Sequence, residues 1–207
     1  NTMLINTRLG SYFFIGEVLL DVELEYDHPA FGGCGTCTRC IEACPTGAIV
    51  APYVLDATRC ISYLTIELRG SIPEDMRHRM GNRVFGCDIC QEVCPFNQPR
   101  AHAPLRAAPT REPAFQPREV TLAPRLADLL RMSEEQFRTV FRNSPVKRAK
   151  WRGLRRNVAV AIGNSHDPTT LPLLQQELQR ETDPTVCEHL RWALNQCATH
   201  HPSSQSS

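Results

Sequence analysis

Residues 34–45 read Cys34-Gly-Thr-Cys37-Thr-Arg-Cys40-Ile-Glu-Ala-Cys44-Pro45, and this C-x2-C-x2-C-x3-C-P run decides the fold. Three thiolates at two-residue spacing curl the backbone around one cube of iron and sulfide. The fourth cysteine, set off by three residues and followed by proline, points away toward a neighbouring cube. The run therefore predicts a second cysteine motif elsewhere in the chain.

The second motif consists of Cys60 and the stretch Cys87-Asp-Ile-Cys90-Gln-Glu-Val-Cys94-Pro95. Only its first cysteine is displaced, because 26 residues separate Cys60 from Cys87. Structural zinc sites also use C-x2-C pairs, but they do not need a duplicated C-x2-C-x3-C-P pattern. We therefore expect two 4Fe–4S clusters. The crossover rule assigns Cys34, Cys37, Cys40 and Cys94 to cluster one, and Cys44, Cys60, Cys87 and Cys90 to cluster two.

Composition supports ligand cysteines rather than disulfides. The chain has 207 residues, ten cysteines, 42% hydrophobic residues and a net charge of +1. It has no apolar run of membrane-spanning length and no signal-peptide pattern, so we expect a cytoplasmic protein without a membrane partner. The cytosol keeps thiols reduced. The remaining cysteines, Cys187 and Cys197, lie on apolar helical faces and are interpreted as core residues.

Residues 1–33 are apolar and strand-like. The segment 9–24 is rich in aromatic and β-branched residues, with turn formers at Gly10 and Gly16, and it predicts one or two strands. A lone hairpin is marginal in water, so these strands need a sheet from elsewhere. Because the chain also starts without Met, we expect residues 1–33 to be the end of an upstream α/β domain. The alternative is a hairpin packed on the cysteine-rich part.

The rest of the chain divides into a ferredoxin-like domain at 34–98, a Pro-rich linker at 99–125, a helical domain at 126–199 and a disordered tail at 200–207. Seven of the 16 prolines fall between positions 95 and 125, where they break helices and central strands. Between Cys60 and Cys87 we expect a short helix, with Pro73 at its start, Met76 and Met80 on one face, and Gly81 at its end.

The helical region contains a repeated phrase. Asp167-Pro168-Thr169 and Asp183-Pro184-Thr185 are sixteen residues apart, and each precedes an amphipathic segment. This internal repeat predicts a short HEAT-like repeat region. The expected fold class is α+β, with a two-cluster ferredoxin-like domain followed by an all-α HEAT-like region and with N-terminal strands from an upstream domain.

Four stretches carry a resemblance to a known family. They are NTMLINTRLGSYFFIGEVL at 1–19, CISYLTIELRGSIP at 60–73, GNRVFGCDICQEVCPFN at 81–97 and LRRNVAVAIGNSHDP at 154–168. With them the chain resembles the C-terminal part of the epoxyqueuosine reductases, up to its tail. The displaced Cys60 and the HEAT-like end separate it from ordinary ferredoxins and from reductive dehalogenases.

The resemblance implies a cobalamin-dependent enzyme that reduces epoxyqueuosine to queuosine at the wobble position of tRNA. It implies that the clusters pass electrons to cobalamin, and that Ser62, Cys87 and Asp88 approach it. In the family, a large N-terminal domain holds most of the cobalamin and a proton-donating aspartate, and the resemblance implies that residues 1–33 are the end of this cobalamin-binding, catalytic domain. The aspartate falls upstream of Asn1, so no catalytic residue is expected here, and the chain alone is expected to be inactive. An Asp-x-His-x-x-Gly run, the usual sign of a histidine-ligated cobalamin, does not occur in this sequence.

A basic segment supplies a candidate tRNA surface. Residues 138–156 contain eight Lys or Arg and no acidic residue, a strong local excess in a chain of net charge +1. Trp151 lies in the run and could stack on a base, although a core position is the alternative. The predicted tRNA-binding residues are Arg69, Lys147, Arg148, Lys150, Arg152, Arg155 and Arg156; a solvated helix face is the alternative.

The expected partners are a tRNA with a GUN anticodon and an external electron donor, and the expected state is a monomer. Two other functions compete with this hypothesis. One is a stand-alone electron-transfer protein of the ferredoxin type. The other is a corrinoid-dependent dehalogenase relative that acts on a small molecule. A basic, salt-sensitive RNA surface would favour the tRNA enzyme over both.

Overall fold

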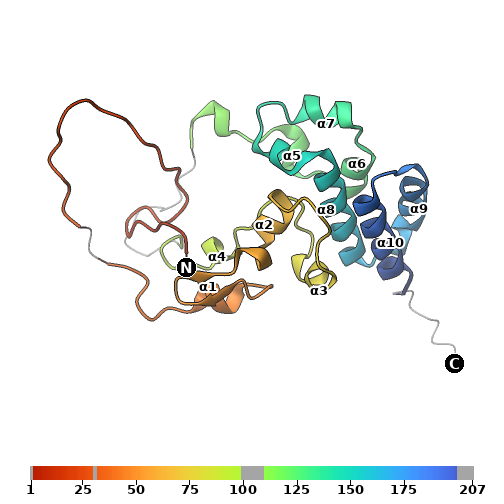
Figure 1. Cartoon of the computed structure of the whole chain (residues 1–207), viewed down its shortest axis with the longest axis horizontal. Coiled ribbons are helices and arrows are strands. Elements are labelled where there is room, and N and C mark those ends of the chain that lie inside the picture. The colour runs from red at the N-terminus through yellow and green to blue at the C-terminus, as the bar shows by residue number, and fades with distance from the viewer. Residues whose placement is uncertain (1, 30–31, 99–109, 200–207) are drawn as a thin grey trace. The chain divides into compact units, whose positions relative to one another are not determined.

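The computed structural model describes residues 2–29, 32–98 and 110–199 (Figure 1). The chain forms two compact units. The first comprises Asn1–Leu55 and Asp88–Phe115, and the second comprises Asp56–Cys87 and Gln116–Ser207. The expected ferredoxin-like stretch 34–98 is thus shared between the units, because its central part groups with the helical region.

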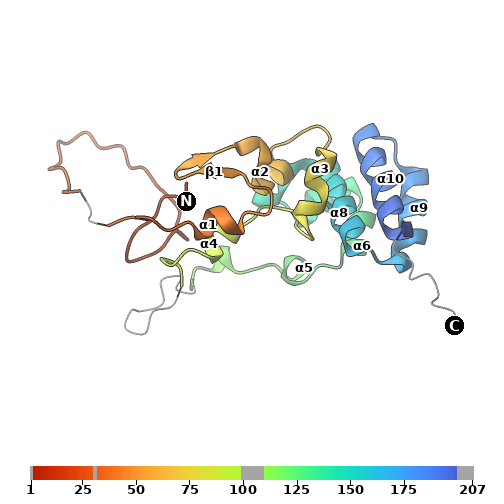
Figure 2. The same cartoon turned by 90° about the horizontal axis from the view of Figure 1, so that it is seen from below.

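The first unit is built on little secondary structure. Helix α1 (Arg39–Ala43) packs against α4 (Ile89–Glu92), so the two cysteine motifs lie side by side (Figure 2). Strands β1 (Ile49–Ala51) and β2 (Val54–Leu55) form an antiparallel pair in which Ile49 faces Leu55. So small a set of elements offers few apolar side chains for a core.

The predicted strands at 9–24 are wrong for this structure. In the described part of 1–33, the only sheet-like pairing is a bridge between Asn6 and Gly10. Apolar side chains in this segment face solvent, and Leu19 is 96% exposed. A strand needs a hydrogen-bonded neighbour along its length, and apart from the bridge at Gly10 the described residues supply none to segment 9–24. Its assignment to an upstream domain stays a prediction.

The second unit is helical, and buried apolar side chains of its packed helices form its core. It contains α2 (Ile61–Ile66), α3 (Glu74–Arg77), α5 (Glu119–Leu122), α6 (Leu126–Arg131), α7 (Glu134–Val140), α8 (Lys150–Ser165), α9 (Leu171–Arg180) and α10 (Pro184–Thr199). Helix α8 is central, since it contacts α2, α6, α7 and α10 (Figure 1). Every residue of α8 between Gly153 and Gly163 is buried.

The predicted helix starts are confirmed. The Asp183 carboxylate accepts hydrogen bonds from the backbone N–H groups of Thr185 and Val186, and Pro184 is the first residue of α10. Asp167 caps the short 3₁₀ turn Pro168–Thr170 in the same way. These carboxylates satisfy N–H groups that have no intrahelical partner. The HEAT-like character of the region stays a proposal.

The expected helix between Cys60 and Cys87 is also confirmed. Pro73 occupies the position before the first residue of α3, Met76 and Met80 are buried, and Gly81 ends the following 3₁₀ turn with a φ of 58°. Of the predicted linker, residues 99–109 lie outside the described part, and 110–125 hold the 3₁₀ turn Pro113–Phe115 and α5. The predicted tail at 200–207 also lies outside it.

None of the helices within the described ranges has the length and apolar character that crossing a membrane requires.

Candidate functional site

Four cysteines of the first unit line one cavity of about 200 Å³. Cys34 and Cys37 lie in the loop before α1, Cys40 lies within α1, and Cys94 follows α4. The rest of the lining comes from Gly33, Arg39, Pro95 and Phe96. These four cysteines are the ligand set predicted for cluster one, and they come from two separate motifs.

Local structure explains this convergence. Gly35 adopts a φ of 57°, which glycine tolerates without strain, and the Cys37 N–H donates to the Cys34 carbonyl oxygen at 3.3 Å. This tight turn leads into α1. Cys40 and Cys94 are buried, with 6% and 4% exposure. Half of the predicted ligand set is therefore shielded from water.

The cavity suits a group larger than a single ion. A water needs only about 10–15 Å³ of such volume, far less than this cavity offers. A cluster spreads its four thiolates around a cube, whereas zinc draws them onto one centre. A cavity of about 200 Å³ lined by four cysteines therefore fits an iron–sulfur cluster.

The Cys44 sulfur has hydrogen-bond donors around it. Ala48 N–H donates to Cys44 Sγ at 3.3 Å, and the Thr46 hydroxyl lies 3.6 Å from it. Burial acts to raise the pKa of Cys44, but hydrogen bonds from Thr46, Ala48 and Ile49 outweigh burial and lower this pKa. The thiolate is the form that binds metal, so these donors favour a ligand role.

The other predicted ligands of cluster two are distributed over both units. Cys90 lies in α4 of the first unit, and Cys60 caps the start of α2 in the second unit. Also in the second unit, the Thr65 hydroxyl of α2 accepts from the Gly86 N–H at 2.9 Å. Helix α2 thereby holds the loop that carries Cys87. The assignment of these cysteines to one cluster remains a prediction.

The residues predicted to approach cobalamin have local partners. The Ser62 hydroxyl donates to the Cys87 carbonyl oxygen at 3.3 Å. The Asp88 carboxylate is exposed and accepts from Gln91 Nε2 at 2.6 Å. These bonds account for Ser62 and Asp88 as structural residues, so their geometry alone gives no argument for cobalamin.

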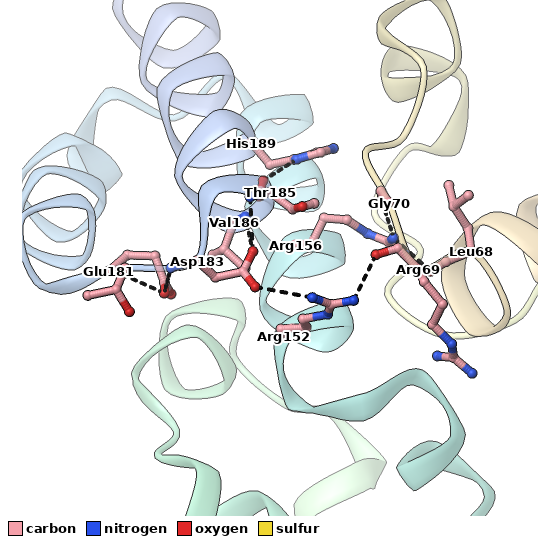
Figure 3. A network of polar contacts seen from close by, with 11 residues as sticks. Leu68, Arg69, Gly70, Arg152, Arg156, Glu181, Asp183, Thr185, Val186 and His189 are labelled. Atoms are coloured by element: carbon pink, nitrogen blue, oxygen red, sulfur yellow. Dashed lines mark hydrogen bonds and ion pairs between the residues drawn. The ribbon is translucent and has the colours of Figure 1, made fainter.

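Five of the seven predicted tRNA-binding residues are exposed: Arg69, Lys147, Arg148, Lys150 and Arg152. Arg148 forms an ion pair with Glu67 at 2.7 Å. Arg152 lies 3.4 Å from Asp183 and donates to the Arg69 carbonyl oxygen at 3.3 Å (Figure 3). The Arg69 guanidinium in turn donates to the Arg148 carbonyl oxygen at 2.9 Å. These contacts join the 66–70 loop to the start of α8 in one basic surface.

Arg156 does not lie on this surface, which corrects its predicted role. It is 1% exposed, and its guanidinium donates to the carbonyl oxygens of Leu64, Leu68 and Gly70 at 2.6–2.9 Å. Figure 3 shows it directed toward the 68–70 loop. Burial, with help from the nearby positive Arg69 and Arg152, lowers the pKa of Arg156 to about 10. It fastens α2 and its loop to α8 and is unavailable to RNA.

Arg155 is also buried, so its predicted RNA contact is corrected as well. Its guanidinium lies 3.3 Å from Glu177 and 3.1 Å from Glu181, and all three side chains are less than a tenth exposed. It also covers the ring of Trp151 at 5.0 Å. The Trp151 Nε1–H donates to the Met132 carbonyl oxygen at 2.8 Å, which favours the core alternative for this tryptophan.

Two buried polar groups were not predicted from the sequence. Asn157 is fully buried and donates to the carbonyl oxygens of Thr65 and Val84 at 2.8 and 2.9 Å. In the first unit, the Ser11 hydroxyl donates to Gln91 Oε1 at 2.9 Å. Their partners lie 73 or more positions away along the chain, so no local pattern indicates them.

Comparison with known proteins agrees with the cysteine geometry. Residues 33–97 match the family model described as a 4Fe-4S double cluster binding domain. The chain is 46% identical over 197 residues to the epoxyqueuosine reductase of Escherichia coli (strain K12), covering 95% of this chain and 50% of that protein. It is also 46% identical over 198 residues to the Pseudomonas aeruginosa enzyme, covering 94% and 52%.

Solved structures of epoxyqueuosine reductases are also similar to this chain. The epoxyqueuosine reductase from Streptococcus thermophilus matches with a TM-score of 0.83 at 27% identity, over 98% of this chain and 51% of that one. An epoxyqueuosine reductase crystallised with a tRNA-Tyr epoxyqueuosine-modified stem loop matches with a TM-score of 0.69 at 26% identity, over 95% and 59%. An iron–sulfur cofactor is thus supported by both family and geometry. The chain is therefore a relative of the epoxyqueuosine reductases, and it spans about half the length of those it matches.

Proposed function

We propose that the protein to which this chain belongs reduces epoxyqueuosine to queuosine in tRNA, and that this chain delivers the electrons and docks the RNA. One observation carries the proposal: cysteines from both motifs line a single cavity, in a chain 46% identical to an epoxyqueuosine reductase. A tRNA substrate would place the protein in the cytoplasm, and an external donor would supply its electrons.

The cysteines perform the electron-delivery role by holding two clusters. Cys34, Cys37, Cys40 and Cys94 hold cluster one, and the set Cys44, Cys60, Cys87 and Cys90 holds cluster two. When bound, a 4Fe–4S cluster supplies a centre that takes up and releases one electron at a time. Burial of Cys40 and Cys94 limits water at the first site, and amide donors at Cys44 stabilise a thiolate at the second.

Cobalamin would supply the reducing metal centre that faces the epoxide. Ser62, Cys87 and Asp88 are proposed near it from the family resemblance. Because the Ser62 and Asp88 side chains have local partners, the support for cobalamin comes from the relatives and not from these side chains. The proton donor is proposed to lie outside this chain.

The tRNA-docking role falls to the exposed basic surface of Arg69, Lys147, Arg148, Lys150 and Arg152. Phosphates of an RNA backbone are the natural partners of such a cluster. A relative of similar fold was crystallised with a tRNA-Tyr stem loop, which supports an RNA partner of this kind. A tRNA with a GUN anticodon is the proposed substrate.

Nucleoside analysis of tRNA tests the reaction. A bacterial strain that lacks its own epoxyqueuosine reductase should accumulate epoxyqueuosine, and the gene for the complete protein should restore queuosine. Cys37→Ser and Cys90→Ser should each abolish this restoration, because each removes a ligand of one cluster. An Arg79→Ala variant, altered at an exposed residue outside the basic surface, is the control. Full queuosine formation by either cysteine variant would refute the proposed role of the clusters.

A further inference from the structure

Ser11 connects two residues that flank Cys94 within the first unit. It is 5% exposed, and its hydroxyl donates to Gln91 Oε1 at 2.9 Å while accepting from Asn97 Nδ2 at 2.8 Å. Its backbone N–H donates to Asn97 Oδ1 at 2.8 Å. Ser11 therefore commits both its amide and its hydroxyl to a segment 80 or more positions away.

The same two partners hold the backbone of Cys94. The Cys94 N–H donates to the Gln91 carbonyl oxygen at 3.1 Å, and the Asn97 N–H donates to the Cys94 carbonyl oxygen at 2.9 Å. Asn97 and Gln91 are also joined directly, because Asn97 Nδ2 donates to the Gln91 carbonyl oxygen at 2.8 Å. Both peptide groups of Cys94 thus depend on residues that Ser11 fixes.

The conformation of Gly10 is independent evidence that residues 10 and 11 pack closely against the loop after Cys94. Its φ is 81°, and a Cβ atom added there would lie 2.1 Å from Asn97 Oδ1 and 3.0 Å from the Phe96 carbonyl oxygen. Only glycine allows the 10–11 backbone to come so close to the loop after Cys94. Gly16, in the same segment, has no atom within 4 Å of such a Cβ.

Cys94 needs such support more than the other ligands of the cavity. Cys34, Cys37 and Cys40 share one short loop and helix, whereas Cys94 reaches the cavity from the end of a four-residue helix. A helix of one turn is not stable by itself. The position of the Cys94 sulfur therefore depends on what holds the backbone around it.

We propose that Ser11, Gln91 and Asn97 are positioning residues that fix Cys94 as the fourth ligand of cluster one. The inference rests on the ligand set in the proposed function. Hydrogen bonding and solvent exposure around a cluster set its reduction potential. Loosening the Cys94 backbone should therefore change the potential and retention of cluster one, while cluster two keeps its own values.

The test uses protein prepared without oxygen, with iron and sulfide supplied. The variants are Ser11→Ala, the nearly isosteric Asn97→Asp, and Gly10→Ala with Gly16→Ala as its matched control. Redox titrations followed by electron paramagnetic resonance give the potential of each cluster, and a chelator gives the rate of iron loss. The signal altered in Cys37→Ser identifies cluster one.

We expect Ser11→Ala and Asn97→Asp to shift the potential of cluster one only, and to speed its iron loss by roughly tenfold or more, because each change removes two hydrogen bonds and the loss of one is worth roughly tenfold. Gly10→Ala should do the same, and Gly16→Ala should match the unmodified protein. Unchanged potentials and iron loss in Ser11→Ala and Asn97→Asp would overturn the inference, and so would equal shifts in both clusters. Unmodified protein without two clusters would instead overturn the proposed function.

Discussion

Gly163 of α8 lies against the indole ring of Trp192 of α10, and a Cβ atom at position 163 would come within 2.5 Å of Trp192 Cζ3. The Cα atom of Ala193 would lie at 3.0 Å. Because this neighbour is backbone, it cannot move aside without shifting α10. The pair sets how closely the two longest helices of the second unit approach each other.

We predict that Gly163→Ala lowers the free energy of unfolding by about 1–3 kcal/mol, the usual cost of overpacking. Chemical denaturation followed by circular dichroism measures it. Gly153→Ala is the matched control in the same helix, because its nearest contact would be an ordinary 4.0 Å. That variant should be neutral or gain up to about 1 kcal/mol from helix propensity. Equal destabilisation by both changes would contradict the close α8–α10 contact.

Arg156→Met should lower the free energy of unfolding by about 3 kcal/mol or more. It removes the charged donor of the buried Leu64, Leu68 and Gly70 carbonyl groups. Arg152→Met, at a half-exposed side chain with contacts of 3.3–3.4 Å, should cost at most about 1 kcal/mol. Thermal denaturation of both variants makes the comparison, and a stable Arg156→Met protein would show that this arginine is not structural.

His189 predicts a loss of stability in acid. It is fully buried, its Nε2 accepts from the Ile72 N–H at 3.1 Å, and its Nδ1–H donates to the Thr185 carbonyl oxygen at 2.7 Å. Only the neutral ring fits both bonds. Burial is the main cause that lowers the pKa of His189 to about 4, and the positive charges of Arg77 and Arg156 add to it, although the Thr185 bond and Glu188 oppose it.

Between about pH 6.5 and 4 the unfolded chain therefore binds a proton that the folded chain does not, and lower pH favours unfolding. The contribution is present above pH 6.5 and is lost as the pH falls toward 4, by up to about 3 kcal/mol. Unfolding free energies of the unmodified protein and His189→Gln, measured across this range, isolate the effect. An identical pH slope in the two proteins would rule out this role of His189.

The basic surface predicts a salt-dependent affinity for tRNA. Replacing Lys147, Arg148 and Lys150 with Ala should weaken binding and flatten its salt dependence by up to about 0.7–0.9 log unit for each lost phosphate contact. Because Arg148 is paired with Glu67, it should contribute less than the two lysines.

A second triple variant provides the control for this experiment. Arg79, Arg131 and Arg180 are exposed in the same unit, and changing them to Ala removes the same charge elsewhere. Filter binding at several salt concentrations compares the two proteins. Equal loss in both, or an unchanged salt slope in the first, would show that residues 147–150 form only a solvated face.

The elements predicted correctly from the sequence are those with local causes. The caps at Asp167 and Asp183 and the short helix at Met76 depend on neighbours within a few residues, so spacing was sufficient. The convergence of Cys94 with Cys34 also followed from spacing, because cluster ligands obey a fixed pattern.

The errors come from contacts that are distant in sequence. Arg155 and Arg156 look like surface cations, and only their buried partners on α2, α9 and the adjoining loops show otherwise. The segment 9–24 has strand composition, but composition cannot supply the neighbour that a strand requires. The role of Ser11 could not be predicted from the sequence, because its partner Asn97 lies far away along the chain and only the structure brings the two together.

Electron paramagnetic resonance of reduced Cys94→Ser tests most directly whether Cys94, from the second cysteine motif, is a ligand of cluster one. The unmodified protein should contain about eight irons, four in each cube. The spectrum of Cys94→Ser should match that of Cys37→Ser and differ from that of Cys90→Ser, because Cys94 and Cys37 line the same cavity. A Cys94→Ser spectrum that instead matches Cys90→Ser would contradict the assignment of Cys94 to cluster one, and a protein that holds zinc in place of iron would contradict both clusters.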